Sequence, residues 1–271
     1  MTSTRSDSAY FSQFGEDRLL DNMFSGKSKG CCVEVGANDG VTGSTTLYFE
    51  TKGWNCLLIE PNPALCQRLR ADRSSRVIEC AASSEEGEVS LYVAEGAPGA
   101  HAVSTMEGSE EEALRQISSH GFRGREIKVK TRTLDRIFES SDITSGIDFI
   151  SIDVEGHELA VLKGLSLRRW RPSVLIVEDN TWGRDLAVRD YLRGHDYALI
   201  RRTGVNDWYA PKSDSTLVNL KNATAYKIAL PIENLKFRYL ARAKVFIRGL
   251  PGVLWLWSRW KARRTRSANA K

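Results

Sequence analysis

Long apolar runs, paired cysteines and a signal segment are all missing from this sequence. No window approaches the roughly 18 to 20 apolar residues that a membrane-spanning helix needs, and the opening residues, MTSTRSDSAYFSQ, lack the apolar core of a secretion signal. The five cysteines form no CxxC pair and have no histidine at metal-ligand spacing. We therefore expect a cytoplasmic protein with reduced, structural cysteines, neither secreted nor integral to a membrane.

Acidic side chains are missing from the last part of the chain. Residues 234–271 contain eleven lysines and arginines and no aspartate or glutamate, although the net charge of all 271 residues is only +5. The other 233 residues carry 28 basic and 34 acidic side chains. Because the positive charge is confined to the tail, the body lacks the basic surface expected of a nucleic-acid-binding domain, and we do not expect nucleic acid as a partner.

The body alternates short apolar runs with segments of helical character. Runs rich in Val, Ile and Leu predict parallel strands that are covered on both faces, at 31–37, 55–60, 76–82, 147–154 and 173–178. Helices are predicted between and after them, at 45–52, 63–72, 133–139, 157–165 and 184–193. This order predicts an α/β fold with a doubly wound, mainly parallel sheet.

Two further segments depart from the strand-helix repeat. Residues 197–203 and 207–210, joined through Gly-Val-Asn, predict an antiparallel hairpin that closes the sheet. Residues 94–125 are rich in Gly, Ser and Glu and predict a long polar insertion, either a lid or a disordered loop.

Three strand ends carry residues suited to a cofactor. The first predicted strand ends in EVGANDG, which lacks the third glycine of the dinucleotide fingerprint and has instead the acid-x-Gly-x-x-x-Gly pattern of S-adenosylmethionine (SAM) methyltransferases. Gly36 and Gly40 let the backbone turn tightly and approach a ligand, while Glu34 suits an amine. Glu60 ends the second strand, where a carboxylate accepts from ribose hydroxyls. Ala81 near the third leaves room for an adenine. For the glycine motif alone, the alternative is an ordinary strand-to-helix turn without a cofactor.

Six short motifs in sequence order carry a resemblance to a known family. They are SQFGED (12–17), VEVGANDG (33–40), GW followed by LLIEPNP (57–63), TLD (133–135), IDVEGHE (152–158) and VLKG (161–164). Over about residues 10–210, the chain resembles the FkbM-type SAM-dependent methyltransferase family. The resemblance implies a class I methyltransferase (Rossmann-like) fold. It also implies methyl transfer mainly to hydroxyl oxygens of sugars, glycolipids and polyketide-like natural products.

The resemblance also implies which residues meet SAM. It assigns cofactor contacts to Gln13, Asp17, Glu34, Gly36, Asn38, Gly40 and Glu60. The first two of these are also open to a second interpretation, as caps of a first helix. We expect an N-terminal helical segment (1–29) that contributes to the cofactor pocket, a methyltransferase domain (30–212), and a basic, Trp-rich extension (213–271).

The stretch FISIDVEGHE places acids and a histidine at the end of a buried strand. Methyl transfer to a hydroxyl requires loss of its proton, so a base, a metal or both are expected at this tip. The catalytic candidates are Asp153, Glu155 and His157, and Asp153 is also a cofactor candidate. Glu155 and His157 are open to a second interpretation, because helix N-termini favour acids and a first-turn histidine commonly faces solvent.

A metal is one way to activate the hydroxyl. Asp153 with Asp179 and Asn180 resembles the magnesium site of catechol-type O-methyltransferases, and hard oxygen ligands of this kind suit Mg²⁺. The sequence departs from that family, because Gly156 stands where a lysine is expected. His157 is then the alternative base, since an imidazole titrates near neutral pH.

The tail combines tryptophans with basic residues, as in VLWLWSRWKARRTR. This composition suits an anionic membrane surface, such as the inner face of the membrane, while packing on the body, a homodimer contact or a disordered basic end are alternatives. We expect a SAM-dependent O-methyltransferase whose acceptor is a hydroxyl of a saccharide, glycolipid or secondary metabolite. An RNA 2′-O-methyltransferase and an inactive membrane-associated binding protein are the alternatives.

Overall fold

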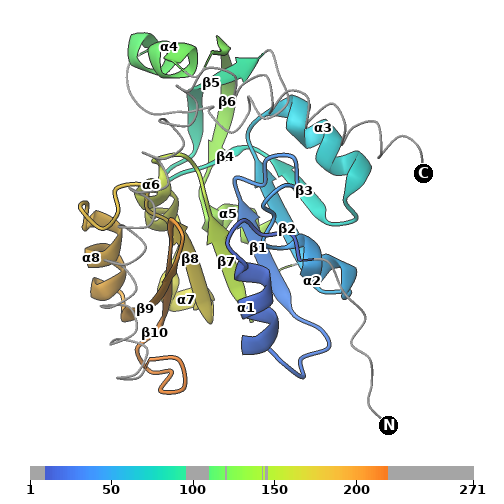
Figure 1. Ribbon diagram of the computed structural model, residues 1–271, viewed down its shortest axis with the longest axis vertical. Coiled ribbons are helices and arrows are strands. Elements are labelled where there is room, and N and C mark those ends of the chain that lie inside the picture. The colour runs from blue at the N-terminus through green and yellow to red at the C-terminus, as the bar shows by residue number, and fades with distance from the viewer. Residues whose placement is uncertain (1–9, 96–109, 120, 142, 144–145, 219–271) are drawn as a thin grey trace, which may run out of the picture. The chain divides into compact units, whose positions relative to one another are not determined.

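The computed structural model describes residues 10–95, 110–119, 121–141, 143 and 146–218 (Figure 1). Their main sheet has the strand order β3-β2-β1-β7-β8-β10-β9. The bounds are β1 Cys31–Val35, β2 Asn55–Glu60, β3 Arg76–Glu79, β7 Phe149–Ile152, β8 Val174–Glu178, β9 Tyr197–Thr203 and β10 Asn206–Pro211. The first five run parallel, and β10 is antiparallel to both β8 and β9. The doubly wound, mainly parallel sheet and its closing hairpin are confirmed.

Helices cover both faces of this sheet because its strands are apolar on both faces (Figure 1). One face packs against helices α1 Glu16–Met23, α2 Leu47–Thr51 and α3 Pro63–Asp72. The other packs against α5 Leu134–Glu139, α6 Glu158–Lys163, α7 Leu167–Trp170 and α8 Ala187–Gly194. Strand β1 shows the alternation: Cys32 faces the first group, while Val33 and Val35 face the second.

Helix starts follow from local capping. The Asn62 side chain accepts a hydrogen bond from the Ala64 amide, and Pro63 occupies the first helical position of α3. Thr133 does the same for α5 by accepting from the Arg136 amide. These signals explain why the observed α3 matches its predicted bounds and α5 differs by one residue.

The predicted polar insertion is partly folded, which corrects the sequence-based expectation. A second sheet, of order β4-β6-β5, comprises β4 Ala81–Ala82, β5 Gly87–Glu95 and β6 Arg123–Arg132. Helix α4, Glu110–Ser119, packs Ala113 and Ile117 against Tyr92 and Ala94 of β5. Polar side chains on the exposed faces of β5 and β6 hid this small core. Residues 96–109 and 120 of the insertion lie outside the described residues.

The five cysteines are free and buried. None of the described helices is long and apolar enough to cross a bilayer. The interpretations of the basic, Trp-rich tail concern residues 219–271, which lie outside the described residues.

Candidate functional site

The strand order reverses between β1 and β7, and ligands of open α/β sheets bind outside the carboxyl ends of strands at such a point. The two tips touch there. The Asp153 amide donates to the Val35 carbonyl at 3.0 Å, and a Cβ atom on Gly36 would lie 1.8 Å from the Asp153 carbonyl oxygen. Gly36, at φ +82°, therefore makes its close approach to the backbone of the neighbouring strand tip.

Glu34 lies on the face of β1 toward α2. The loop that leads into α2 encloses its side chain. Its carboxylate accepts from the Ser44 hydroxyl at 2.8 Å, the Thr45 amide at 2.7 Å and the Thr46 hydroxyl at 2.5 Å. Burial raises the pKa of Glu34 despite these bonds. Both carboxylate oxygens thus hold the loop after the glycine turn. Gly40 also packs on protein, since its Cβ would lie 2.3 Å from Leu69.

Glu60 joins the first two strand tips. Its Oε2 accepts from the Asn38 amide and its Oε1 from the Asn62 amide, both at 2.9 Å. Burial raises the pKa of Glu60 to about 7. Asn38 has φ +53°, and its side-chain Oδ1 is buried without a hydrogen-bond partner.

This arrangement fits SAM. A buried acceptor without a partner costs free energy, and a ribose hydroxyl is a donor that would satisfy Asn38 Oδ1. Glu60, with one bond on each oxygen, retains lone pairs for the same hydroxyls.

The N-terminal segment folds beside the glycine turn. Asp17 accepts from the amides of Phe11 and Ser12 at 2.5 and 3.1 Å, so its carboxylate shapes this segment. A bridge from Ser12 to Gly43 brings Gln13, which is exposed, beside the loop after β1. The contacts of Gln13 and Asp17 with SAM stay predictions.

Ala81 is buried in the small sheet. It is 1% exposed and packs with Leu91, Val93 and Val129 in the core of the small sheet. Its predicted contact with adenine gains no support from this packing.

Carboxyl groups gather at the tips of β7 and β8. Glu158 accepts from the Val154 amide at 3.2 Å and the Gly156 amide at 3.0 Å, which fixes the turn after β7. Glu155 occupies this turn with φ +53°. Asp153 is exposed as a residue, yet protein atoms crowd its carboxyl group, which shares a hydrogen bond with Glu178.

Burial and like charge together raise the pKa of these acids. Burial, followed by the charges of Asp153 and Glu155, raises the pKa of Glu178 to about 10. Burial and the charge of Asp153 raise the pKa of Glu155 to about 7. Burial also raises the pKa of Asp153, although the bond from Glu178 opposes this effect. Glu178, with a pKa of about 10, therefore keeps its proton at neutral pH and donates it to Asp153.

His157 lies beside the residue that follows β4. Its Nε2 lies 3.1 Å from the Ser83 hydroxyl, just beyond β4. The imidazole therefore links the start of α6 to the end of β4. Its role as a base stays a prediction.

Asp179 has a structural role that the sequence does not reveal. Its Oδ1 accepts from the Thr181 amide at 2.8 Å, and its Oδ2 accepts from the Gly183 amide at 2.6 Å and from Arg202 at 2.7 Å. Burial would raise the pKa of Asp179, but the bonds from Thr181 and Arg202 outweigh it and lower that pKa. Arg202, whose side chain is wholly buried, also binds Asp207 at 2.9 Å.

The predicted magnesium set of Asp153, Asp179 and Asn180 gains no support from this geometry. Both oxygens of Asp179 already accept protein hydrogen bonds. Across the described ranges, no group of three or more His, Cys, Asp and Glu side chains is placed to hold a metal ion.

Sequence reasoning missed three contributors to this edge: Glu16, Glu178 and Arg202. Glu16 is 1% exposed and accepts from the Thr203 hydroxyl at 2.8 Å and the Asn206 amide group at 2.9 Å, which ties α1 to the closing hairpin. The motif SQFGED contained this residue. The sequence also indicates Glu178, because this acid ends an apolar run. Arg202 had no such signal, since Asp179 is distant in sequence and Asp207 meets Arg202 only across the hairpin.

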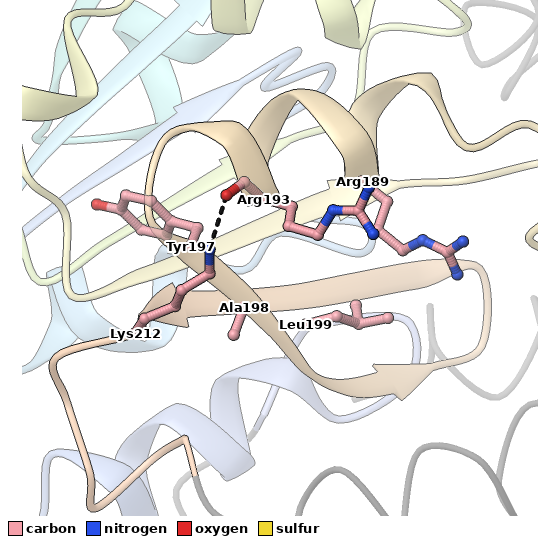
Figure 2. A pocket seen from close by; sticks show the side chains of 6 residues that line it. All are labelled: Arg189, Arg193, Tyr197, Ala198, Leu199 and Lys212. Carbon is pink, nitrogen blue, oxygen red and sulfur yellow. Dashed lines mark hydrogen bonds between the residues drawn. The ribbon is translucent and has the colours of Figure 1, made fainter.

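A surface hollow of about 280 Å³ lies between α8 and β9, away from this edge. Figure 2 shows the side chains that line it: Arg189, Arg193, Tyr197, Ala198, Leu199 and Lys212. Tyr197 and its pairing partner Pro211 lie at the opposite end of the hairpin from Asn206, which pairs with Glu178. None of the predicted site residues lines the hollow.

Known proteins resemble this chain in sequence. Residues 34–199 match the family described as the methyltransferase FkbM domain. A hexuronic acid methyltransferase, AglP, of Haloferax volcanii is 31% identical over 151 residues, which are 54% of this chain and 54% of that protein. The match thus spans about half the length of this relative.

Solved structures give weaker likenesses. TrmK of M. capricolum, in complex with S-adenosyl-homocysteine, has a TM-score of 0.42 at 11% identity and covers 95% of this chain and 98% of its own. An O-methyltransferase from Bacillus cereus has a TM-score of 0.36 at 13% identity and covers 75% of this chain and 81% of its own. Likeness of this degree carries no functional conclusion.

Proposed function

Because this chain belongs to the FkbM methyltransferase family, we propose that it transfers the methyl group of SAM to a hydroxyl oxygen of a saccharide. The observation that carries the proposal is the pairing of two sites at one switch point, one with acceptors suited to SAM and one where Asp153 accepts a hydrogen bond from Glu178. The sugar acceptor draws support from the relative named a hexuronic acid methyltransferase.

Glu60 and Asn38 hold the cofactor in this proposal. Glu60 accepts from the ribose hydroxyls while keeping its two backbone bonds, and Asn38 Oδ1 gains the donor it lacks. SAM, when bound, supplies an electrophilic methyl group on a sulfonium. The glycine turn that carries Asn38 is fixed by the loop bound to Glu34, so the site is formed before SAM enters.

Asp153 is the proposed base. The Asp153 carboxylate would take the hydroxyl proton, and the acceptor oxygen would bond to the methyl carbon as the methyl–sulfur bond breaks and S-adenosyl-homocysteine leaves. A raised pKa makes this carboxylate a stronger base than an ordinary aspartate, and Glu178 keeps it oriented through their shared hydrogen bond. The saccharide acceptor is held by the carboxyl groups around Asp153, which accept from its other hydroxyls.

The test is a screen of purified protein with labelled SAM against glycans, glycolipids and small phenols, with and without EDTA. We expect methylation of a saccharide or glycolipid that persists in EDTA, because Asp179 is occupied by protein donors. Loss of activity in EDTA, restored by Mg²⁺, would favour the metal set instead. His157→Gln retains a side chain that bonds to Ser83, and loss of the reaction in this variant but not in Asp153→Asn would assign the base to His157.

We further propose that the acceptor is presented at a membrane. The tail, residues 234–271, combines tryptophans with eleven basic residues and no acid, which suits anionic lipid. Deletion of 234–271 should leave the rate on a short soluble acceptor unchanged and lower it on the same headgroup in acidic vesicles. Equal rates in both settings would contradict a lipid role for the tail.

A further inference from the structure

The end of α3 packs under the glycine turn, residues 36–40. Leu69 lies in the last part of this helix, and Arg73 is its C-terminal cap four residues later. A Cβ atom on Gly40 would lie 2.3 Å from the Leu69 side chain and 3.3 Å from Nη1 of Arg73. Leu69 also packs with Ala37 in a small buried cluster. The turn therefore rests on α3 at both Ala37 and Gly40.

Arg73 binds this turn and its loop with all three guanidinium nitrogens. Nη1 donates to the Gly40 carbonyl at 2.5 Å and to the Ser44 hydroxyl at 3.3 Å. Nη2 donates to the Thr46 hydroxyl at 3.2 Å, and Nε donates to Glu50 at 2.9 Å. The Arg73 side chain has no exposed surface. A lysine could not make these bonds together, because one ammonium group lacks the planar fork of a guanidinium.

The same hydroxyls connect Arg73 to Glu34. Ser44 and Thr46 each accept from Arg73 and donate to the Glu34 carboxylate. A hydroxyl has one proton and two lone pairs, so these partners fix the direction of both O–H bonds. The loop after the glycine turn is therefore held between a buried cation and a buried carboxylate.

The Gly40 carbonyl links Arg73 to the residues proposed to hold SAM. Gly40 is buried, and its amide donates to the Ala37 carbonyl at 2.9 Å, which closes the turn that carries Asn38. Without Arg73, the Gly40 carbonyl would lose a charged donor in a buried position, which costs free energy unless the turn moves. A shifted turn would displace the Asn38 amide from Glu60, to which it donates.

We propose that Arg73 is a positioning residue for SAM, which holds the glycine turn so that Asn38 and Glu60 meet the ribose hydroxyls in the correct orientation. Because its side chain is wholly buried, Arg73 acts through the Gly40 carbonyl and not by contact with the cofactor. This inference rests on the ribose contacts of the proposed function and is independent of the acceptor.

The experiment measures SAM binding to the full-length protein by calorimetry without an acceptor, at a temperature where circular dichroism shows each variant folded. Arg73→Met removes every donor and should raise the Kd for SAM at least about tenfold. Arg73→Lys keeps the charge and one donor group, so the Kd should rise less, by about threefold to tenfold. Should Arg73→Met not fold, Arg73→Lys decides. Arg70→Lys makes the same change at an exposed residue of α3 and should leave the Kd unchanged.

Two readouts separate positioning from general stability. Leu192→Ala creates a cavity in the core under α8, so it should lower the free energy of unfolding and leave the Kd for SAM unchanged. With an acceptor that the wild type methylates, Arg73→Lys should raise KM for SAM and keep kcat at saturating SAM within about threefold, because the residues around Asp153 are untouched.

The outcomes distinguish this inference from the sugar proposal. An unchanged Kd in folded Arg73→Lys, an equal rise in Leu192→Ala, or a fall in kcat with unchanged KM for SAM would overturn the positioning role. SAM binding by the wild type without methylation of any saccharide would overturn the sugar acceptor and leave the role of Arg73 intact. A wild type that does not bind SAM would overturn both.

Discussion

The carboxylates at the tips of β1 and β2 differ from those at the tips of β7 and β8. Glu34 and Glu60 each accept hydrogen bonds from backbone amides, and Glu34 from hydroxyls as well. Asp153, Glu155 and Glu178 mainly face one another, and Glu178 keeps a buried oxygen without a partner. The carboxylates of Glu34 and Glu60 receive hydrogen bonds from the surrounding fold, whereas Glu178 keeps a buried acceptor oxygen without a donor.

Under the proposed function, the difference separates two tasks along one edge of a sheet. A cofactor of constant shape is best met by groups that the fold already orients, which lowers the entropy cost of binding. Proton removal requires a base with a raised pKa, and such a base is obtained by burying like charges together at a cost in stability. Each of the following predictions tests one side of this comparison.

The largest effect is expected at Asp153. Asp153→Asn removes the proposed base and should lower kcat by about 10² to 10⁴-fold, measured under single-turnover conditions. SAM affinity, measured by calorimetry, should change less than about threefold because Glu60 and Asn38 remain. Asp190→Asn, an exposed substitution on α8, is the control and should keep the full rate. An unchanged rate in Asp153→Asn would remove it as the base.

Arg202 tests the acids near the acceptor side that pair with a cation, Asp179 and Asp207. Arg202→Met leaves Asp179 and Asp207 without their partner and should lower the free energy of unfolding by about 3 to 5 kcal/mol in urea titrations. Arg70→Met breaks an exposed pair with Glu79 and should cost less than about 1 kcal/mol. Similar losses in the two variants would show that the Arg202 bonds do not stabilise the loop after β8.

Glu60 tests the carboxylates at the tips of β1 and β2. Glu60→Gln keeps the size of the side chain but weakens its bonds to ribose, and should reduce SAM affinity by about 1.5 to 3 kcal/mol in calorimetry. Glu79→Gln, at the exposed tip of β3, is the matched control and should bind SAM as the wild type does. Equal affinities in all three proteins would remove the ribose assignment.

The smallest effect is expected at Glu155 and depends on pH. The folded pKa of about 7 lies above the usual value near 4.5, so its ionisation reduces stability progressively as the pH rises from about 5 to 8. Glu155→Gln should therefore change the free energy of unfolding little at pH 5 and raise it by about 1 kcal/mol at pH 8, after allowance for solvent screening. A gain in the free energy of unfolding that is larger at pH 5 than at pH 8 would contradict this prediction.

The sequence predicted the main sheet because its strands are continuous apolar runs, as at β2, where predicted and observed bounds are the same. It missed the small sheet, because β6 exposes one face and reads as polar. The sequence indicated Asp153 and Glu60 as candidate site residues because both end apolar runs. The partners of two other acids at this edge depend on tertiary contacts, Glu16 with Thr203 and Asp179 with Arg202, which no local pattern encodes.

The contact between Gly36 and the Asp153 carbonyl also governs how this edge can vary. A methyl group at position 36 would lie 1.8 Å from that oxygen and require a backbone at φ +82°, which L side chains rarely adopt. In a saturation library, position 36 should accept glycine alone among the twenty residue types. Directed evolution of a new acceptor preference can therefore vary Glu155 among the residue types that tolerate its φ of +53°, while the spacing between the glycine turn and the tip that carries Asp153 stays fixed.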